Sequence, residues 1–364
     1  MKPKVYFTDT KTSLSVNLFD KLEHLIKESG ILNLIKPGQF VAIKTHFGEE
    51  GVNTFVSPLF VRKIVELVES CGGLAFLTDT NALYRGARMN AIDHIKLAHR
   101  HGFNFAPIII ADGLNSQDYV EISISGKYYK KIKIAKAIAE SDTVIVVSHF
   151  KGHLVSGFGG AIKNLGMGCV PKESKLIMHS NTHPYIAESK CTGCGICREH
   201  CPQAAIVIDS VAKILDERCI GCTGCIGVCP QRAIRIKWED AGRELGEKIA
   251  EHALGVTKLV KRIGYINFLI DITPLCDCAG TSQPPFVPNI GILAGFDPVA
   301  IDKASYDLVL KAPPLYPELK GDYFKKLNPM SEPLAQIEHG EKIGLGIASY
   351  ELVKVEPPRK KNED

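Results

Sequence analysis

No apolar run in this sequence of 364 residues approaches the roughly 18 residues that a membrane span needs. The first residues, MKPKVYFTDTKTS, lack the apolar core and the small-residue cleavage site of a secretory signal, so we expect a cytoplasmic protein without a membrane span. The formal net charge is only +4, and the one dense basic run, at residues 359–361, has no base-stacking aromatic motif beside it. These absences argue against nucleic acid as a partner.

The rest of the sequence has the composition of an ordinary globular chain, with 45% hydrophobic and 23% charged residues. Its length corresponds to about two domains of about 150 residues each. Apolar runs alternate with amphipathic stretches, which predicts an α/β fold in which mostly parallel strands are flanked by helices on both faces. We expect strands at residues 5–8, 40–46, 74–78, 107–111 and 143–148, helices at 14–29, 58–71 and 90–101, and an inserted hairpin at 120–134.

The pattern changes at residues 186–238, where Cys, Gly and Pro are dense and the strands are short. The alternation then resumes, with helices expected at 239–262 and 298–310 and strands at 265–273 and 290–293. The sequence therefore predicts an α/β domain in two parts, 1–185 and 239–364, with a small α+β domain inserted at 186–238. We expect the tail after Ala312 to wrap around the surface.

Cysteine is abundant and clustered, since eight of the 12 cysteines lie within 39 residues. In a cytosolic chain such a cluster indicates metal binding before disulfide formation. Two runs have the spacing Cys-x2-Cys-x2-Cys-x3-Cys-Pro of bacterial ferredoxins, in which the fourth cysteine of each run binds the other cluster. We therefore expect two [4Fe–4S] clusters, the first held by Cys191, Cys194, Cys197 and Cys229, and the second by Cys219, Cys222, Cys225 and Cys201.

Zinc is the alternative occupant of a four-cysteine site, but zinc sites usually combine two Cys-x2-Cys pairs that are separated by a longer loop. The two halves of the block also repeat each other, because CPQAAI at residues 201–206 matches CPQRAI at residues 229–234. This duplication is typical of dicluster ferredoxins, whose paired clusters form an electron path. A purely structural role for the clusters remains an alternative.

Polar side chains follow three of the expected strands. Lys44 and His46 end one strand, Asp79 follows the next, and His153 comes shortly after a third. Open α/β folds bind ligands at the carboxyl ends of their parallel strands, so we expect a common cleft there. Lys44 and Arg88 would hold an anionic substrate or cofactor, while His46, His153 and Asp79 would move protons.

A glycine-rich loop at residues 157–166 includes Gly159 and Gly160 and leads to Lys163. Glycines permit close backbone approach and leave N–H groups for an anion, so we expect this loop to bind a cofactor or substrate and Lys163 to act in the reaction. The loop lacks the Gly-x4-Gly-Lys-Ser/Thr order of a P-loop and is not a dinucleotide fingerprint. A tight turn at the entry of a helix is an equally good interpretation.

Two further pairs of residues are candidates for metal binding or redox chemistry. Cys276 and Cys278 form a Cys-x-Cys pair after an expected strand, and metal ligation, thiol reactivity and burial as core thiols all remain open. His179 and His183 would share one face of a helix, although Pro184 ends any helix there.

Five segments outside the cysteine block resemble the iron–sulfur protein family known as domain of unknown function 362. They lie at residues 44–48, 79–88, 149–153, 157–168 and 271–278. The resemblance covers nearly the whole chain and includes the ferredoxin insertion. It implies involvement in redox chemistry, but it implies no settled reaction.

A second and more distant resemblance, to nickel-pincer lactate racemase, rests on the order His153-x9-Lys163-x15-His179. In that family the lysine anchors the pincer cofactor and the later histidine binds nickel, so the resemblance implies a cofactor site here. The chain departs from the family near Thr45 and His46, where the Asp and the Arg of an Asp-x-Thr-Arg segment are missing.

These features predict an iron–sulfur electron-transfer protein that acts as a low-potential oxidoreductase between two [4Fe–4S] clusters and a small-molecule or cofactor site in the cleft. The expected partner is a redox protein or a small-molecule substrate. A non-catalytic electron carrier, a module that delivers metal or clusters, and a nickel-pincer-like metal site are the alternatives. A further organic or metal cofactor in the cleft, catalytic activity and the oligomeric state stay open.

Overall fold

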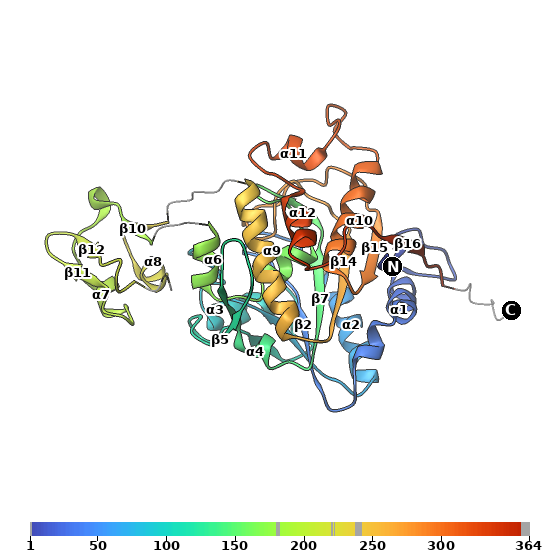
Figure 1. The fold of residues 1–364 in the computed structure, drawn as a ribbon, viewed down its shortest axis with the longest axis horizontal. Coiled ribbons are helices and arrows are strands. Elements are labelled where there is room, and N and C mark those ends of the chain that lie inside the picture. The colour runs from blue at the N-terminus through green and yellow to red at the C-terminus, as the bar shows by residue number, and fades with distance from the viewer. Residues whose placement is uncertain (1, 180–182, 220, 222, 237–241, 358–364) are drawn as a thin grey trace.

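The computed structural model describes residues 2–179, 183–219, 221, 223–236 and 242–357 of the chain. Its centre is an eight-stranded sheet (Figure 1) made of β1 (Lys4–Asp9), β2 (Phe40–Lys44), β3 (Leu74–Asp79), β4 (Ile108–Ile110), β7 (Thr143–His149), β14 (Ile263–Leu269), β15 (Gly291–Gly295) and β16 (Glu351–Lys354). The strand order is β16-β1-β15-β14-β7-β2-β3-β4. Neighbouring strands are parallel, except that β15 is antiparallel to both β1 and β14. The α/β fold with a mostly parallel sheet, as predicted, is confirmed.

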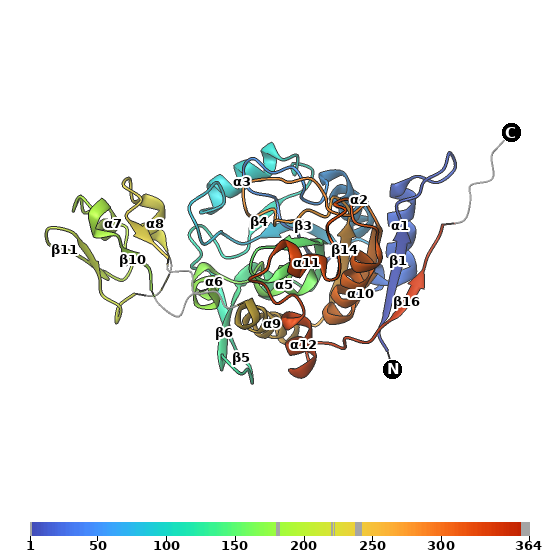
Figure 2. The same ribbon diagram turned by 90° about the horizontal axis from the view of Figure 1, so that it is seen from above.

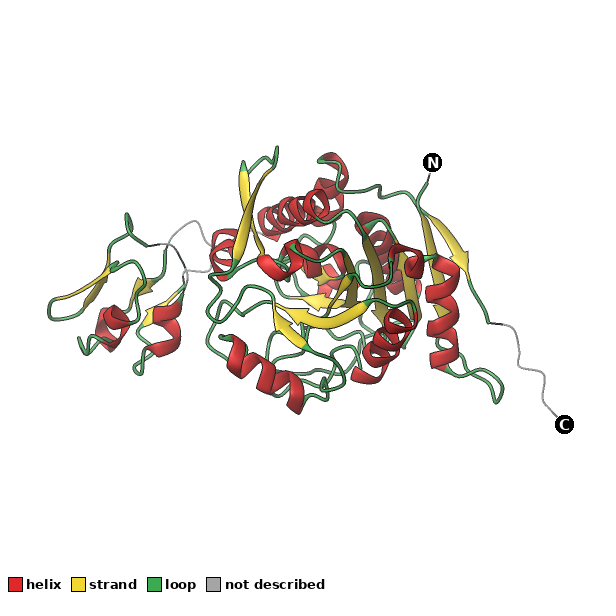
Figure 3. Ribbon diagram, turned by 90° about the horizontal axis from the view of Figure 1, so that it is seen from below, coloured by secondary structure: helices red, strands yellow, loops and turns green. Residues whose placement is uncertain are grey.

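Helices cover both faces of the sheet (Figure 3). One face packs against α1 (Leu18–Ser29), α2 (Pro58–Ser70) and α3 (Ala91–Arg100), and the other against α5 (Ala161–Gly166), α9 (Gly242–Leu259), α10 (Pro298–Lys311) and α12 (Ala335–Lys342). Ile145 and Val147 of β7 pack with the first group of helices. Val144 and Val146 pack with the second. Because every residue of β7 and β14 is buried, polar groups of these strands reach a ligand only at the strand ends.

Local capping signals fix where the helices begin. The Asn17 side chain accepts hydrogen bonds from the N–H groups of Phe19 and Asp20 in a capping box, so the helix that was expected from residue 14 begins at Leu18. Proline occupies the first position of both α2 and α10, where its missing N–H costs nothing. The short helices η1 (Ile31–Leu34) and α4 (Lys136–Ala139) lead into neighbouring strands.

The hairpin predicted at residues 120–134 is confirmed as β5 (Tyr119–Ser123) and β6 (Lys131–Ala135). Its turn is held from α9 by the buried carboxylate of Glu251. This carboxylate accepts hydrogen bonds from the backbone N–H groups of Lys127, Tyr128 and Tyr129. The hairpin is therefore fixed to the body by a residue that lies more than a hundred positions further along the chain.

Between α6 (Lys172–His179) and α9 the chain forms a small unit beside α6, apart from the sheet (Figures 1 and 2). Its elements are β10 (Tyr185–Ile186), η2 (Glu188–Lys190), α7 (Ile196–Glu199), β11 (Ile206–Ile208), β12 (Ala212–Ile214), α8 (Gly224–Val228) and β13 (Ile234–Arg235). β10 pairs with β13 and β11 with β12, around an apolar core of its own. The boundaries 1–185, 186–238 and 239–364 stay a prediction, and residues 237–241 lie outside the described residues.

The tail after Ala312 contains α11 (Tyr323–Leu327) and α12, and it ends by adding β16 to the edge of the sheet beside β1. β16 has no pattern of its own in the sequence, because this four-residue strand is stabilised by its pairing with distant β1. No helix of the described residues is long and apolar enough to cross a membrane.

Candidate functional site

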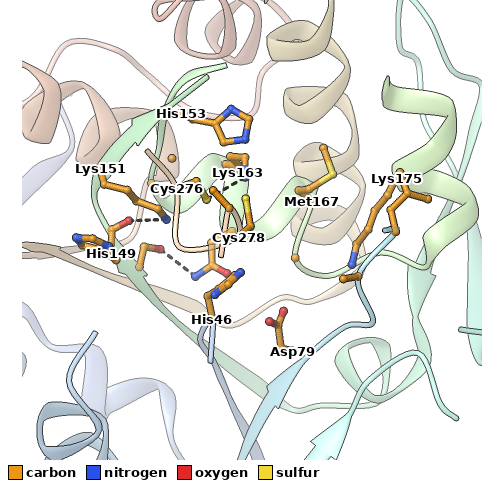
Figure 4. Close-up of a pocket in the computed structure, with 18 of the residues that line it drawn as sticks. His46, Asp79, His149, Lys151, His153, Lys163, Met167, Lys175, Cys276 and Cys278 are labelled. Carbon is orange, nitrogen blue, oxygen red and sulfur yellow. Dashed lines mark hydrogen bonds between the residues drawn. The ribbon is translucent and has the colours of Figure 1, made fainter. Parts of the chain in front are cut away.

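A cavity of about 730 Å³ lies at the carboxyl ends of β2, β3 and β7 (Figure 4). Open α/β sheets bind ligands at this edge, and the volume is that of a small-molecule site. All residues predicted for the cleft line this cavity: Lys44, His46, Asp79, Arg88, His153, Gly159, Gly160 and Lys163, together with His179, Cys276 and Cys278. The structure thus brings them together, while the role of each residue stays a prediction.

Lys44 and Asp79 form a buried ion pair at the ends of β2 and β3, with 2.9 Å between Nζ and Oδ1. Lys44 Nζ also donates a hydrogen bond of 2.7 Å to Asn164 Oδ1. Burial alone would raise the pKa of Asp79, but Lys44 and the neighbouring His46, His94 and Arg88 together outweigh burial and hold this pKa well below its ordinary value. Asp79 is therefore a carboxylate at neutral pH.

His46 stands beside this pair as a neutral imidazole. Burial lowers the pKa of His46 well below its ordinary value, and the charge of Arg88 adds to the effect. The Nδ1 atom of His46 accepts a hydrogen bond of 2.9 Å from the N–H of Gly48, so the proton of the neutral ring lies on Nε2. Arg88 in turn donates hydrogen bonds to Glu49 and to the hydroxyl of Tyr84.

Lys151 is a cavity residue that the sequence analysis did not select. It lies on β8 (Lys151–His153), which turns back and pairs with β9 (Gly157–Gly159) directly after β7. Its Nζ donates to the carbonyl oxygen of His149 at 3.1 Å and lies 3.4 Å from Asp277 Oδ2. Burial lowers the pKa of Lys151, but Cys276 and Asp277 outweigh burial and raise it to about 12.

Lys175 of α6 is a second cavity residue that the sequence analysis missed. Its Nζ donates hydrogen bonds to Thr80 Oγ1, at 2.7 Å, and to the carbonyl oxygen of Asn81. Burial lowers the pKa of Lys175 to about 8, against the opposing effects of Asp112 and Asp79. No local pattern distinguishes Lys175 from the other lysines, because only the packing of α6 takes it into the cavity.

This pKa gives a testable dependence of stability on pH. The folded protein binds fewer protons than the unfolded chain between about pH 8 and about 10.5, so Lys175 makes the fold more stable as the pH rises through this window. The variant Lys175→Met should lack that rise, which amounts to about 3 kcal/mol at most. Urea midpoints measured from pH 7.5 to 10 test this, with Lys96→Met, whose side chain is 66% exposed, as the control. Parallel pH profiles for wild type and Lys175→Met would contradict it.

The glycine-rich loop leads into helix α5, and the negative group at the start of this helix is a side chain of the protein itself, Asp302. The N–H groups of Ala161 and Ile162, the first residues of α5, donate to the carboxylate of Asp302 at 2.7 and 2.8 Å. A Cβ atom at Gly160 would lie 2.3 Å from Asp302 Oδ1, which explains the glycine. These two N–H groups therefore fit the interpretation of the loop as a tight turn at the entry of a helix, and not the interpretation as an anion site. Gly159 and Gly160 still line the cavity, and binding of a cofactor by them stays a prediction.

Cys276 and Cys278 lie on the cavity wall, and their sulfur atoms and a ring nitrogen of His153 all lie within 4.8 Å of one another. Lys163 Nζ is 3.9 Å from Cys276 Sγ (Figure 4). A hydrogen bond from Cys278 and the charges of Lys163 and Lys151 lower the pKa of Cys276 well below its ordinary value. The pKa of Cys278 is raised well above its ordinary value by the same sulfur contact and by burial. The pKa values of the two thiols are thus shifted in opposite directions, and Cys276 is the more acidic of the pair.

Two thiol groups and an imidazole can hold a soft metal ion, but the hydrogen bonds of His153 fit that role poorly. Its Nδ1 accepts from the N–H groups of Val155, at 3.3 Å, and Ser156, at 3.1 Å, so the neutral ring carries its proton on Nε2. A metal ion bound at Nε2 would displace this proton to Nδ1. There the proton would face the N–H groups of Val155 and Ser156, which are also donors, so both hydrogen bonds would be lost. Burial, with the charge of Lys163 added, lowers the pKa of His153 well below its ordinary value, which keeps the ring neutral. His153 is therefore a hydrogen-bond donor through Nε2.

The two cysteine runs line two further small cavities in the inserted unit. One cavity is lined by Cys191, Cys194, Cys197 and Cys229. The other is lined by Cys201, Cys219 and Cys225, and Cys222 lies outside the described residues. The cysteines of the described residues carry no disulfide bond.

The chain belongs to the family described as "Domain of unknown function (DUF362)", whose model matches residues 41–307. Among solved structures it is similar to the lactate racemase apoprotein from Thermoanaerobacterium thermosaccharolyticum, at 14% identity and a TM-score of 0.38, over 73% of this chain and 51% of that chain. It is also similar to a protein from Thermotoga maritima, at 11% identity and a TM-score of 0.37, over 71% and 52% of the two chains. The chain thus spans about half the length of these structures. No curated protein matches the sequence.

Proposed function

We propose that this protein passes electrons between two [4Fe–4S] clusters and a small-molecule or cofactor site in the large cavity. The observation that carries the proposal is the crossed sorting of the cysteines: Cys229 of the second run joins the cavity of the first, and Cys201 of the first run joins the cavity of the second. Ferredoxin-type clusters require this crossing, whereas separate zinc sites do not. The donor sets therefore fit the clusters.

Backbone N–H groups that point at cysteine sulfurs support the same ligand sets. Cys201 Sγ accepts a hydrogen bond of 3.3 Å from the N–H of Ala205, and Cys229 Sγ accepts one of the same length from Ala233. Each donor lies four residues after its cysteine, so the two halves of the repeat are equivalent in structure as well as in sequence. Hydrogen bonds of this kind stabilise thiolate ligands and tune the potential of a cluster.

Contacts between the inserted unit and the cavity wall favour electron transfer into the cavity. Arg85 Nη1 donates a hydrogen bond of 3.1 Å to the carbonyl oxygen of Cys229, and its neighbour Tyr84 lines the cavity. Gly221 is in the same run, beside Cys219, which lines the second cysteine cavity. It packs so closely on Leu176 that a Cβ atom there would be 2.8 Å from Leu176 Cδ2. Leu176 follows Lys175 on α6, the helix that lies between the inserted unit and the body in Figures 1 and 2.

The charges of the cavity favour an anionic ligand. Lys151, Lys163 and Lys175 all line it. Among the described residues no carboxylate lies within ion-pair distance of Lys163 or Lys175, whereas Asp277 is 3.4 Å from Lys151. A carboxylate or similar anion would complete the charge balance of such a site.

Anaerobic purification followed by metal and sulfide analysis tests the cluster part of the proposal. We expect about eight iron and eight sulfide per chain. Zinc in place of iron, or about four iron, would refute it. A single-turnover experiment then separates an oxidoreductase from a non-catalytic carrier, because only the former reoxidises its reduced clusters with a small molecule in the absence of a partner protein.

A nickel-pincer-like site is the second candidate function. It is favoured by one observation: His153, Lys163 and His179, which carry the resemblance to the racemase family, all line the same cavity. In this alternative Lys163 would anchor the organic cofactor and His179 would bind nickel, which would supply hydride-transfer chemistry. Nickel at about one per chain, together with a modification on the Lys163 peptide in mass spectrometry, would support it. Iron alone and an unmodified Lys163 would exclude it.

A further inference from the structure

The Cys-x-Cys segment places its two cysteines on the cavity wall and buries its central carboxylate. Cys276 and Cys278 line the cavity, whereas the buried Asp277 does not line it and accepts hydrogen bonds from His149 Nδ1, at 3.0 Å, and Thr54 Oγ1, at 3.2 Å. A turn closed by a hydrogen bond of 2.9 Å from the N–H of Ala279 to the carbonyl oxygen of Cys276 fixes this arrangement. Residues in such a turn are close enough for their cysteines to form a disulfide bond.

The surroundings of the pair suit thiol–disulfide chemistry better than burial as core thiols. Lys163 Nζ lies 3.9 Å from Cys276 Sγ, so a thiolate at Cys276 faces an ammonium group. His153 shares this corner of the cavity with both sulfurs, and its proton is on Nε2 because Nδ1 accepts two backbone hydrogen bonds. The site therefore holds a nucleophilic thiolate, a second thiol that can resolve a mixed disulfide, and a proton donor.

We propose that Cys276 and Cys278 are a redox-active pair that uses electrons from the clusters to reduce a small anionic disulfide in the cavity, an inference that rests on the proposed function. In the first half-reaction the Cys276–Cys278 disulfide takes one electron from each of the two reduced clusters and two protons, so that its S–S bond breaks and two thiols form. In the second half-reaction the Cys276 thiolate attacks the substrate disulfide and releases one thiol. Cys278 then attacks the mixed disulfide, releases the second thiol and restores the Cys276–Cys278 disulfide.

The substrate class follows from the charges of the cavity. Lys163 Nζ lies 3.9 Å from Cys276 Sγ, and Lys151 and Lys175 line the same cavity. A disulfide with carboxylate groups would bind to these lysines, whereas a disulfide with amino groups would be repelled.

The test uses the full chain with both clusters, reduced anaerobically by illumination with a deazaflavin. The probe is 3,3′-dithiodipropionate, a dianionic disulfide, and cystamine, a dicationic disulfide, is the matched control. We expect one molecule of the probe to reoxidise both clusters of a chain and to yield two thiols, at a rate at least about tenfold higher than cystamine. With an excess of the probe, a second molecule then oxidises the two thiols, so mass spectrometry of the wild type should find that the peptide with Cys276 and Cys278 has lost two hydrogen atoms.

The variants Cys276→Ser and Cys278→Ser should slow the reoxidation of the clusters at least about tenfold, while Cys71→Ser, at the end of α2, should not change it. Unchanged iron content in all three variants shows that they fold. Equal rates in wild type and in Cys276→Ser, or a stoichiometric metal ion that both cavity variants lose, would overturn the inference. If the clusters are absent the proposed function fails, whereas reducible clusters without formation of the Cys276–Cys278 disulfide refute only the inference.

Discussion

The variant Cys201→Ser is expected to lose the cluster that belongs to the second cysteine run, although Cys201 is part of the first run. Cys229→Ser should have the reverse effect. The reason is geometric, because Cys201 lines the same cavity as Cys219 and Cys225, while Cys229 lines the cavity of the first run. Each replacement removes one of four thiolate ligands, so the iron content should fall from about eight to about four per chain.

Double variants show which cluster each cysteine holds. Cys201→Ser combined with Cys225→Ser removes two ligands of one cluster, so about four iron should remain. Cys201→Ser combined with Cys194→Ser removes a ligand from each cluster, so the iron content should fall close to zero. Single and double variants are compared with Cys71→Ser, which should keep all of its iron. If the two double variants gave the opposite result, each run would fill its own cluster and the crossed assignment would be wrong.

The cavity positions of Lys44, Asp79 and His153 could be predicted from the sequence because they depend on a simple property of parallel sheets. Each residue lies at or shortly after the end of an apolar strand, and the carboxyl ends of β2, β3 and β7 meet at one edge. This property holds whichever parallel strands are neighbours, so the order of the strands is not needed to predict it. The ferredoxin spacing of the two runs also predicted which described cysteines share a cavity, while the assignment of cysteines to clusters stays a prediction.

Other parts of the site depend on contacts between residues that are distant in sequence, and these could not be predicted. The N–H groups at the start of α5 are bound by Asp302, which lies on α10, so the loop that resembled an anion site already has its anion. Lys175 reaches the cavity only because α6 packs at its wall, and Lys151 only because β8 turns back onto β9. In each case the position of the residue depends on tertiary packing, which no local sequence pattern indicates.

Replacing Asp277 with asparagine is expected to lower the free energy of unfolding by about 3–5 kcal/mol, because it leaves a buried positive charge without its counter-ion. The Asp277 side chain is fully buried, and its carboxylate lies 3.0 Å from His149 Nδ1 and 3.4 Å from Lys151 Nζ. Burial would raise the pKa of Asp277, but the charges of His149 and Lys151 outweigh it and hold this pKa well below its ordinary value. The stabilisation is therefore complete above about pH 4 and is lost as the pH falls further.

Urea unfolding of the wild type and of Asp277→Asn at pH 7, with a second series at acidic pH, measures this effect. Glu338→Gln is the matched control, because its carboxylate pairs with Arg243 on the surface, where both side chains are 53% exposed. A surface pair of this kind contributes at most about 1 kcal/mol, so the control should stay close to the wild type. The difference between wild type and Asp277→Asn should shrink as the pH falls below about 4, because the Asp277 carboxyl of the unfolded wild type then binds a proton while that of the folded protein does not. An effect of Asp277→Asn no larger than that of Glu338→Gln would mean that the buried charges are not held by this carboxylate, and the turn that carries Cys276 and Cys278 would then lack the anchor described above.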